Sequence, residues 1–327
     1  MTNTVGQSTT ARANANIAFI KYWGNIDDAL RLPANPSISM NLDGLFTQTT
    51  VTWREDLAAD QLTLNGQSAE AQALRRVSTH LDALRQRLAI SGYAAVESAN
   101  NFPTGAGIAS SAAAFAALTI AAAAAAGLTL SERELTTLAR LGSGSASRSV
   151  PSGFVEWYSG ATHEQSFAES IASPDHWDIV DVVAIVSHAH KTTGSSEGHQ
   201  SANSSDYQTA RVAGASDRLV VCKRALLERD FATFAEIVEH DSNMMHAVMM
   251  TSRPPLFYWQ PATLGVMEHV RQWRADGLRV CYTLDAGPNV HCICVRGDME
   301  QVREGLKQLS DVQDVLVANP GGPAQII

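Results

Sequence analysis

The stretch NNFPTGAGIASSAAAFAAL, residues Asn100–Leu118, decides which fold to expect. Glycine, alanine and serine fill its middle, and it runs into the alanine-rich segment TIAAAAAAGL. A phosphate-binding loop needs small residues, because its backbone N–H groups must approach the anion closely, and it needs a helix N-terminus behind it. The stretch offers both, yet it has neither the lysine of a Walker A loop nor the spacing of a Rossmann loop. Taken alone, it leaves open both a phosphate loop and a plain capped helix.

The composition narrows the class of protein. The chain has 327 residues, of which 45% are hydrophobic and 17% charged, as in globular proteins with one large domain or two. A net charge of -9 argues against a general nucleic-acid binder, which needs a concentrated basic surface. The four cysteines lack the spacing of a zinc site, and free thiols suit a reducing compartment. With neither a signal-peptide pattern nor a membrane-span pattern, we expect a cytoplasmic protein that binds neither nucleic acid nor membranes.

The first part of the chain shows strands followed by helices. Alternating residues predict strands in NIAFIKYW, SISMNL and FTQTTVTW, and apolar residues at helical spacing predict a helix over 68–90. A strand follows from Tyr93, and the alanine-rich helix then ends at Gly127, a good C-terminal signal. The next helix opens with Ser131 and Glu134 at the spacing of a capping box.

The character of the chain changes near residue 190. The segment KTTGSSEGHQSANSSDYQTA, residues 191–210, is polar and rich in serine and glycine, which predicts a loop or a junction. Beyond it, helical segments alternate with strand-like runs such as RVCYTLDA and NVHCICV, which indicates a second α+β domain. We therefore predict two domains, residues 1–190 and residues 191–327.

Five segments resemble, in this order along the chain, signature segments of mevalonate diphosphate decarboxylases, a family in the GHMP superfamily of small-molecule kinases. They are ANIAFIKYWG (15–24), the stretch 100–118, GSGSASRSVPSGFVEW (142–157), DSNMMHAVMMTSRPPLFYW (241–259) and LDAGPN (284–289). The KYWG and SGSASRS blocks are specific to the decarboxylases, whereas the glycine-rich loop is shared by the kinases of the superfamily. The five segments are spread over nearly the whole length of the chain, and together they favour the phosphate loop over the plain capped helix.

The resemblance implies a fold and a reaction. The fold is α+β, a two-domain GHMP kinase fold with an N-terminal domain like ribosomal protein S5 domain 2, a C-terminal ferredoxin-like domain, and the active site in the cleft between them. With Mg²⁺, ATP phosphorylates the 3-hydroxyl of a 5-phosphorylated mevalonate; loss of that phosphate and of CO₂ then leaves an isopentenyl ester. Family members are commonly homodimers, so we expect a homodimer.

The resemblance also implies roles for single residues. Asp285 would orient or deprotonate the 3-hydroxyl, Arg148 would clamp the substrate carboxylate with its planar fork, and Lys21 would place a positive charge near the phosphates. The implied substrate-binding residues are Asn16, Tyr22, Ser143, Gly144, Ser145, Arg148 and Ser196. The implied ATP-binding residues are Pro103, Gly105, Ala106, Gly107, Ala109, Ser110 and Ser111, of which Ser111 would also ligate Mg²⁺.

One departure from the family concerns the substrate. The family's IKYWGK is IKYWGN here, so Asn25 stands where a lysine usually contacts the terminal phosphate, and Glu197 adds an acid near that end by alignment. Both changes favour mevalonate 5-phosphate, which would give isopentenyl phosphate. The alternatives are decarboxylation of the 5-diphosphate, a 3-kinase that stops before decarboxylation, and a non-catalytic ligand sensor.

Overall fold

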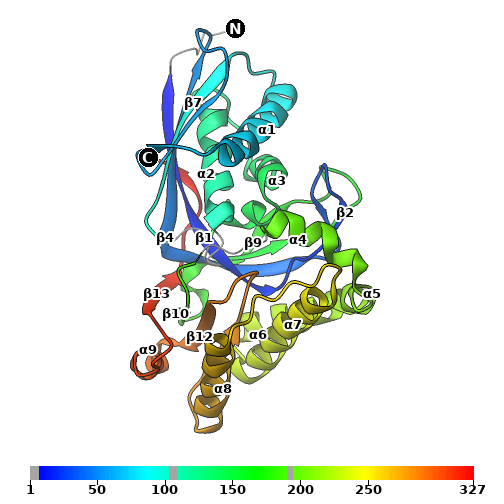
Figure 1. The fold of residues 1–327 in the computed structure, drawn as a ribbon, viewed down its shortest axis with the longest axis vertical. Coiled ribbons are helices and arrows are strands. Elements are labelled where there is room, and N and C mark those ends of the chain that lie inside the picture. Colours follow the sequence, from blue (N-terminus) through cyan, green and yellow to red (C-terminus); the bar gives the residue numbers. More distant parts are fainter. Residues whose placement is uncertain (1–6, 103–109, 190–193) are drawn as a thin grey trace.

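The computed structural model describes residues 7–102, 110–189 and 194–327. The implied ATP-binding residues Pro103, Gly105, Ala106, Gly107 and Ala109 lie outside these ranges. The described chain has a mixed α+β architecture built on a long sheet with helices packed against it (Figure 1). None of the helices in the described ranges is both long and apolar enough to cross a membrane.

The N-terminal part of the sheet carries three helices. Strands β1 (Ser8–Ile20) and β4 (Ser37–Arg54) form its centre, and β7 (Tyr93–Asn100), β5 (Gln61–Leu64) and β6 (Gln67–Ser68) extend it. Helices α1 (Ala71–Leu88), α2 (Ser110–Ala125) and α3 (Glu132–Gly142) share one apolar core with these strands (Figure 1). Alanines let α2 pack closely, and most of that helix is buried.

Three local predictions can be compared with the structure in this part. Ser131 and Glu134 form the capping box expected at the start of α3, and Gly127 takes a left-handed conformation (φ 72°) just after α2. The two strands expected at SISMNL and FTQTTVTW are instead one strand, β4. Gly44, which is left-handed at φ 87°, lies in an irregularity of the β1–β4 register rather than in a turn.

The C-terminal part continues the same sheet. Strands β10 (Ile179–Ile185), β11 (Val280–Thr283), β12 (Val290–Val295) and β13 (Asp314–Pro320) pair antiparallel in the order β11-β12-β10-β13. Helices α6 (Ala215–Glu228) and α7 (Phe231–Thr251) pack on one face, and α8 (Pro261–Ala275) and α9 (Met299–Lys307) pack on the other. A short 3₁₀-helix, η4 (Arg296–Asp298), precedes α9.

The two parts are joined through the sheet. Strand β13 pairs with β4 at Asn319↔Asp43 and Pro320↔Leu42, and β14 (Gln325–Ile326) pairs with β1. Strand β10 precedes residue 190 but pairs with β12 and β13, which follow it. The boundary at residue 190 stays a prediction, because the sheet runs across it.

Short elements cluster near the junction. Strands β2 (Asn25–Asp27) and β3 (Leu32–Pro33) form a hairpin, and β8 (Phe154–Trp157) pairs with β4 and β9 (Ala168–Ala172). The 3₁₀-helix η1 (Gly144–Ser149) precedes β8 in sequence, and η2 (Pro174–His176) follows β9. Most of the segment expected to be a loop at 191–210 is helical where it is described: α4 (Ser195–Ser201) and η3 (Ala202–Ser204) precede α5 (Gln208–Ala213).

Buried His80 gives the fold an acid sensitivity. It lies on α1, its Nε2 is 2.8 Å from Thr119 Oγ1, and burial together with the charge of Arg31 lowers its pKa to about 3. As the pH falls below about 6.5, the His80 imidazole becomes protonated in the unfolded chain but stays neutral in the folded chain. The free energy of unfolding therefore falls. At about pH 5 this difference amounts to roughly 2 kcal/mol. Urea unfolding at pH 7 and pH 5 should therefore show a smaller loss for His80→Gln than for the wild type.

A matched variant separates this effect from general acid sensitivity. His269→Gln removes an exposed histidine from α8 and should leave the loss of stability between pH 7 and pH 5 as in the wild type. An equal loss in His80→Gln and the wild type would contradict the assignment.

Candidate active site

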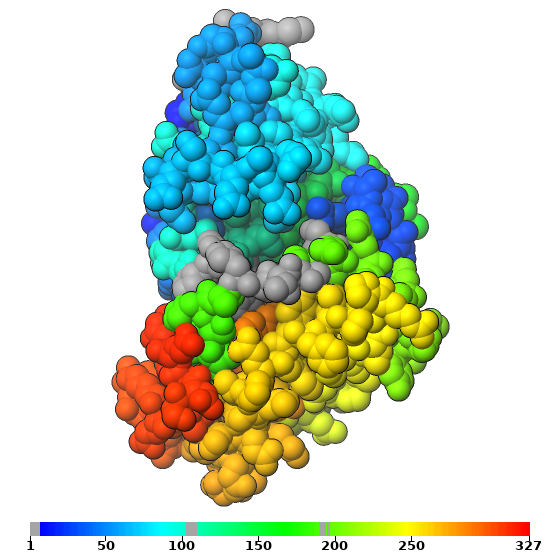
Figure 2. Space-filling view, in the orientation of Figure 1, coloured from blue at the N-terminus to red at the C-terminus, as the bar shows by residue number. Residues whose placement is uncertain are grey.

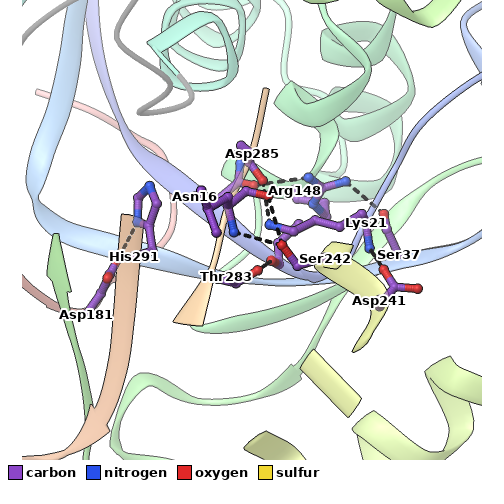
Figure 3. Close-up of polar contacts among 12 residues, drawn as sticks. Asn16, Lys21, Ser37, Arg148, Asp181, Asp241, Ser242, Thr283, Asp285 and His291 are labelled. Carbon is purple, nitrogen blue, oxygen red and sulfur yellow. Dashed lines mark hydrogen bonds and ion pairs between the residues drawn. The ribbon is translucent and has the colours of Figure 1, made fainter. Parts of the chain in front are cut away.

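The implied catalytic residues meet where the two parts of the sheet join. Lys21 follows β1, and Asp285 follows β11 in the turn before β12; their side chains form an ion pair with Nζ 2.7 Å from Oδ1 (Figure 3). The Lys21 side chain is 1% exposed, whereas that of Asp285 is 24% exposed. Asp285 is thus the member of the pair that solvent or a substrate can reach.

Burial and the ion pair act in opposite directions on these two groups. Burial lowers the pKa of Lys21, and the attraction and hydrogen bond of Asp285 only partly offset this. Burial alone would raise the pKa of Asp285, but Lys21, His291 and Arg148 together hold that pKa below its ordinary value. Asp285 is therefore a carboxylate at neutral pH, able to accept a proton or a hydrogen bond.

Arg148 lies beside this pair, on η1. Its side chain is 2% exposed, and it donates to Ser37 Oγ at 2.7 Å and to Asn16 Oδ1 at 3.3 Å (Figure 3). Its Nε is buried without a hydrogen-bond partner among the described residues. Burial lowers its pKa to about 10, so it stays charged at neutral pH. A buried charged donor without a partner is costly, and a bound carboxylate would satisfy it.

The serines of the SGSAS turn lie against the start of α2. Ser143 Oγ is 3.2 Å from Ser111 Oγ and 3.3 Å from Ser145 Oγ. The Asn16 side chain holds this turn in place, because its amide nitrogen donates to the Ser145 carbonyl at 3.1 Å and to Ser149 Oγ at 2.7 Å. The structure thus brings the implied substrate serines next to Ser111, the implied Mg²⁺ ligand. Ser110, the neighbouring ATP residue, is the first residue of α2.

Tyr22 forms the wall facing Gly144. Its ring packs edge-on against Trp157 at an interplanar angle of 67°, and its hydroxyl is 2.5 Å from Asn25 Oδ1. A Cβ on Gly144 would lie 2.5 Å from Tyr22 Cε1 and 2.7 Å from its hydroxyl oxygen, so only glycine allows this approach. Burial raises the pKa of Tyr22, and its phenol therefore stays a neutral donor.

This contact makes Gly144→Ala a sharp test of the wall. The added methyl must displace Tyr22 or η1, which we expect to cost about 1–3 kcal/mol of stability and to lower kcat/KM. Gly265→Ala is the matched control, because nothing lies within 4 Å of its Cβ position on α8. That control should gain about 0.5–1 kcal/mol in urea unfolding. Unchanged stability and kcat/KM in Gly144→Ala would contradict the packing.

Two residues that the family resemblance implies lie on α4, far in sequence from Lys21 and Asp285. Ser196 falls within that helix, and Glu197 is exposed. The next two residues hold α4 onto the KYWG segment: a Cβ on Gly198 would lie 2.5 Å from the Trp23 ring, and His199 stacks on Tyr22 at 4.1 Å. Gly24 N–H donates to His199 Nδ1 at 2.9 Å.

Several residues of this site were not predicted. Asp241 on α7 accepts from Lys21 N at 2.6 Å (Figure 3), and it also accepts from Arg218 Nε at 2.7 Å. Arg211 donates to the Lys21 carbonyl at 2.7 Å. His246 is 1% exposed, and burial and the charge of Lys21 lower its pKa to about 3. Asp241 and His246 lie in one of the five signature segments, which was the available signal; Arg211 had none.

No cluster of three histidine, cysteine or acidic side chains in the described ranges could hold a metal ion. A magnesium ion here would depend on hydroxyl and phosphate oxygens, the hard ligands that Mg²⁺ prefers. The Ser111 hydroxyl at the start of α2 fits that chemistry.

The comparisons with known proteins agree with this geometry. Residues 13–168 match the family described as Diphosphomevalonate decarboxylase-like N-terminal domain, and residues 181–319 match Mevalonate 5-diphosphate decarboxylase C-terminal domain. The diphosphomevalonate decarboxylase mvd1 of Aspergillus fumigatus is 39% identical over 94% of this chain and 81% of its own. The Homo sapiens diphosphomevalonate decarboxylase is 37% identical over 86% of this chain and 75% of its own.

Solved structures of this group have the same fold. The crystal structure of mevalonate diphosphate decarboxylase from Staphylococcus aureus has a TM-score of 0.93 at 36% identity, with 98% of each chain covered. A complex of MDDEF with MVAPP, AMPPCP and magnesium has a TM-score of 0.93 at 35% identity, covering 98% of this chain and 99% of that one. The expected α+β, two-domain GHMP architecture is confirmed.

Proposed function

Because the chain belongs to the mevalonate diphosphate decarboxylase family, we propose that it converts mevalonate 5-diphosphate and ATP to isopentenyl diphosphate, ADP, phosphate and CO₂. The observation that carries this proposal is the ion pair between buried Lys21 and half-buried Asp285, beside the partly unpartnered guanidinium of Arg148. The site thus holds the Asp285 carboxylate, the Lys21 ammonium beside it, and the Arg148 guanidinium, which can bind the carboxylate of the substrate.

The expected preference for mevalonate 5-phosphate is not supported by the comparisons. The relatives carry the diphosphate in their names, and so do the matching families. The diphosphate alternative therefore fits better. The neutral side chain of Asn25 remains a real departure, but it does not by itself identify a monophosphate substrate.

Different residues act in the two steps of the reaction, phosphorylation of the 3-hydroxyl and decarboxylation. Asp285 accepts the proton of the 3-hydroxyl, or its hydrogen bond, as the oxygen attacks the γ-phosphorus of ATP, and Lys21 holds that carboxylate in place. Arg148 binds the substrate carboxylate through its unpartnered Nε–H. When the C3–O bond to phosphate breaks, the C1–C2 bond electrons form the new C2=C3 double bond, and CO₂ departs.

Small polar residues would bind the phosphate groups of the substrate and of ATP. Ser143, Gly144 and Ser145 lie at one end of the site, and Ser111 begins the helix behind the phosphate loop. Mg²⁺, held by the Ser111 hydroxyl and by phosphate oxygens, would neutralise charge on the transferring phosphoryl group. The remaining implied residues of the loop, and Ser196, stay proposals.

One assay tests the proposed function. The wild type is given mevalonate 5-diphosphate or mevalonate 5-phosphate with Mg-ATP, and ADP and CO₂ are both measured. We expect equal ADP and CO₂, with the higher kcat/KM for the diphosphate. Higher kcat/KM for the monophosphate would overturn the choice of substrate, and ADP without CO₂ would mean a 3-kinase. The homodimer also stays a proposal, which sedimentation velocity tests.

A further inference from the structure

The backbone of Lys21 lies at a strand end, where the sheet no longer supplies hydrogen bonds. Strand β1 ends at Ile20, which is paired with Ile38, and Lys21 is the next residue. Lys21 is 1% exposed, so water cannot satisfy its N–H and C=O groups. A buried backbone group without a partner is costly, and other parts of the chain must therefore bind these two groups.

A carboxylate and a guanidinium bind the two sides of this residue. The Lys21 N–H donates to Asp241 Oδ2 on α7 at 2.6 Å, and the Lys21 carbonyl accepts from Arg211 Nη2 on α5 at 2.7 Å. Asn35 Nδ2 is a second donor to that carbonyl, at 2.9 Å. The N–H and the C=O belong to the planar peptide units before and after the Lys21 Cα. The contacts therefore fix both backbone torsions from which the side chain starts.

Arg211 also holds the carbonyl two residues further along the chain. Its Nη1 donates to the Trp23 carbonyl at 3.2 Å and to Asn35 Oδ1 at 3.1 Å. Gln208, three residues earlier on α5, donates to the same Trp23 carbonyl at 3.0 Å. Helix α5 thus binds the segment that contains Lys21 at two of its carbonyl groups.

A third charged residue links the carboxylate to the guanidinium. Arg218 on α6 donates from Nε to Asp241 Oδ1 and from Nη2 to the Arg211 carbonyl, each at 2.7 Å. Both Asp241 and Arg211 are 0% exposed, and Figure 2 shows the surface of α5 against that of α7. Burial lowers the pKa of Arg211 to about 10, against the opposing charge of Asp241, so Arg211 stays charged at neutral pH.

Charged groups are a costly way to bind the backbone of one residue. Replacing a buried ion pair by apolar residues is often neutral or stabilising, so folding alone does not account for this network. Charge-assisted hydrogen bonds are shorter and stronger than neutral ones, which suits an atom that must be kept in place. Figure 3 shows Lys21 between two carboxylates, with Asp241 at its backbone N–H and Asp285 at its ammonium group.

We propose that Arg211 and Asp241 are positioning residues, which hold the Lys21 backbone so that its ammonium group meets Asp285. The inference rests on the proposed function, because that function assigns Lys21 and Asp285 to the phosphorylation step. The two positioning residues act through Lys21 and contact neither substrate nor ATP. The site thereby depends on α5 and α7 as well as on the strand ends that carry the ion pair.

The test begins with Arg211→Lys and Asp241→Asn, which keep most of the volume of each side chain. A single ammonium nitrogen cannot bind the carbonyls of Lys21 and Trp23 together, and an amide binds the Lys21 N–H without charge assistance. Each variant should lower kcat for ADP release about tenfold, with KM for ATP changed less than about twofold. The two variants act on opposite sides of Lys21, so either one tests the inference if the other does not fold.

Arg85→Lys is the matched control for Arg211→Lys. Arg85 on α1 is also largely enclosed, at 14% exposure of its side chain, and its Nε donates to the Gly92 carbonyl at 2.9 Å. Its guanidinium lies over the rings of Trp53 and Tyr93 in the N-terminal part of the fold. The control should have a lower free energy of unfolding and the kcat of the wild type.

Combination with Lys21→Met separates positioning from a structural role. If Arg211 and Asp241 act through Lys21, their replacement has little left to disturb once the ammonium group is absent. Arg211→Lys and Asp241→Asn should then change kcat by less than about twofold in the Lys21→Met background. A structural role would lower kcat by the same factor in both backgrounds, and that result would overturn the inference.

The pH profile of Arg211→Lys is a second readout, because this variant keeps the charge. Burial raises the pKa of Asp285, whereas Lys21, His291 and Arg148 lower it, and only the contact with Lys21 is weakened in the variant. The pKa of Asp285 should therefore rise, and the acid limb of kcat/KM should move to higher pH. An acid limb at the wild-type pH would contradict the inference.

Failure of the inference differs from failure of the proposed function. If the wild type turns over mevalonate 5-diphosphate and both variants keep its kcat within about twofold, the inference is wrong and the proposed function stands. If the wild type turns over only the monophosphate, the proposed substrate is wrong, and the same comparison made with that ester decides the inference. If the wild type releases no ADP with either ester, both fail.

Discussion

Asp285→Asn is expected to lower kcat by about 10²–10⁴-fold, the usual contribution of a general base, with KM for both substrates changed only slightly. The amide keeps the shape of the carboxylate but cannot accept the proton of the 3-hydroxyl. It also deprives Lys21, which is 1% exposed, of its counter-ion at 2.7 Å. Steady-state ADP release and substrate titration measure both effects.

Loss of the counter-ion should also lower stability, because a buried ammonium without its partner is costly. Asp298→Asn is a matched control: Asp298 pairs with Arg279 Nε at 2.9 Å, away from the site, and its replacement should leave kcat unchanged. A double variant with Lys21→Met should be little slower than Asp285→Asn alone, since the two residues act as a unit. A kcat for Asp285→Asn within about tenfold of the wild type would show that Asp285 does not accept the proton.

Arg148→Lys is expected to lower kcat/KM by about 10²–10³-fold, although the charge is kept. The single ammonium nitrogen of lysine cannot reach Ser37, Asn16 and a carboxylate at their separate positions, as the three nitrogens of Arg148 can. Because the clamp acts on the carboxylate and not on the 3-hydroxyl, phosphorylation should suffer less than decarboxylation. ADP release should then exceed CO₂ release, which a coupled assay of both products detects.

Arg140→Lys provides the comparison for Arg148→Lys. Arg140 is also fully buried, but it donates to Leu30 O and to His163 and belongs to the packing of α3. Its replacement should lower stability while ADP and CO₂ remain equal. If Arg148→Lys also kept the two products equal and lost only stability, Arg148 would be a packing residue.

Elements with a local signal were predictable from the sequence. The capping box of α3 needs only Ser131 and Glu134, and its hydrogen bonds form within one turn. Lys21, Arg148 and Asp285 were instead assigned to the site by the family resemblance. Lys21 and Asp285 are 264 residues apart in sequence, and no local pattern connects the three residues. Strands β1 and β11 are not neighbours in the sheet, but the Thr283 hydroxyl on β11 donates to the Ala18 carbonyl on β1 at 3.2 Å, which holds the two strand ends and thus Lys21 and Asp285 together.

Elements fixed by tertiary contacts were not predictable in the same way. Serine and glycine made the segment of α4 look like a loop, yet Gly198 packs on Trp23 and His199 stacks on Tyr22. Burial of these contacts outweighs the weak helix propensity of the segment. In β4, residues 43–45 fell between two predicted strands, whereas pairing with β1 on both sides keeps the strand continuous.

The order in which the sheet's strands are synthesised differs from their order in space. Strand β10 borders β12 and β13, which leave the ribosome more than a hundred residues later, and β1 acquires β14 only after residue 325. A nascent chain of the first 190 residues therefore carries exposed strand edges that it cannot pair by itself. Unpaired strand edges can pair with other chains. We therefore expect the nascent chain to be prone to aggregation until residues 290–326 have been synthesised.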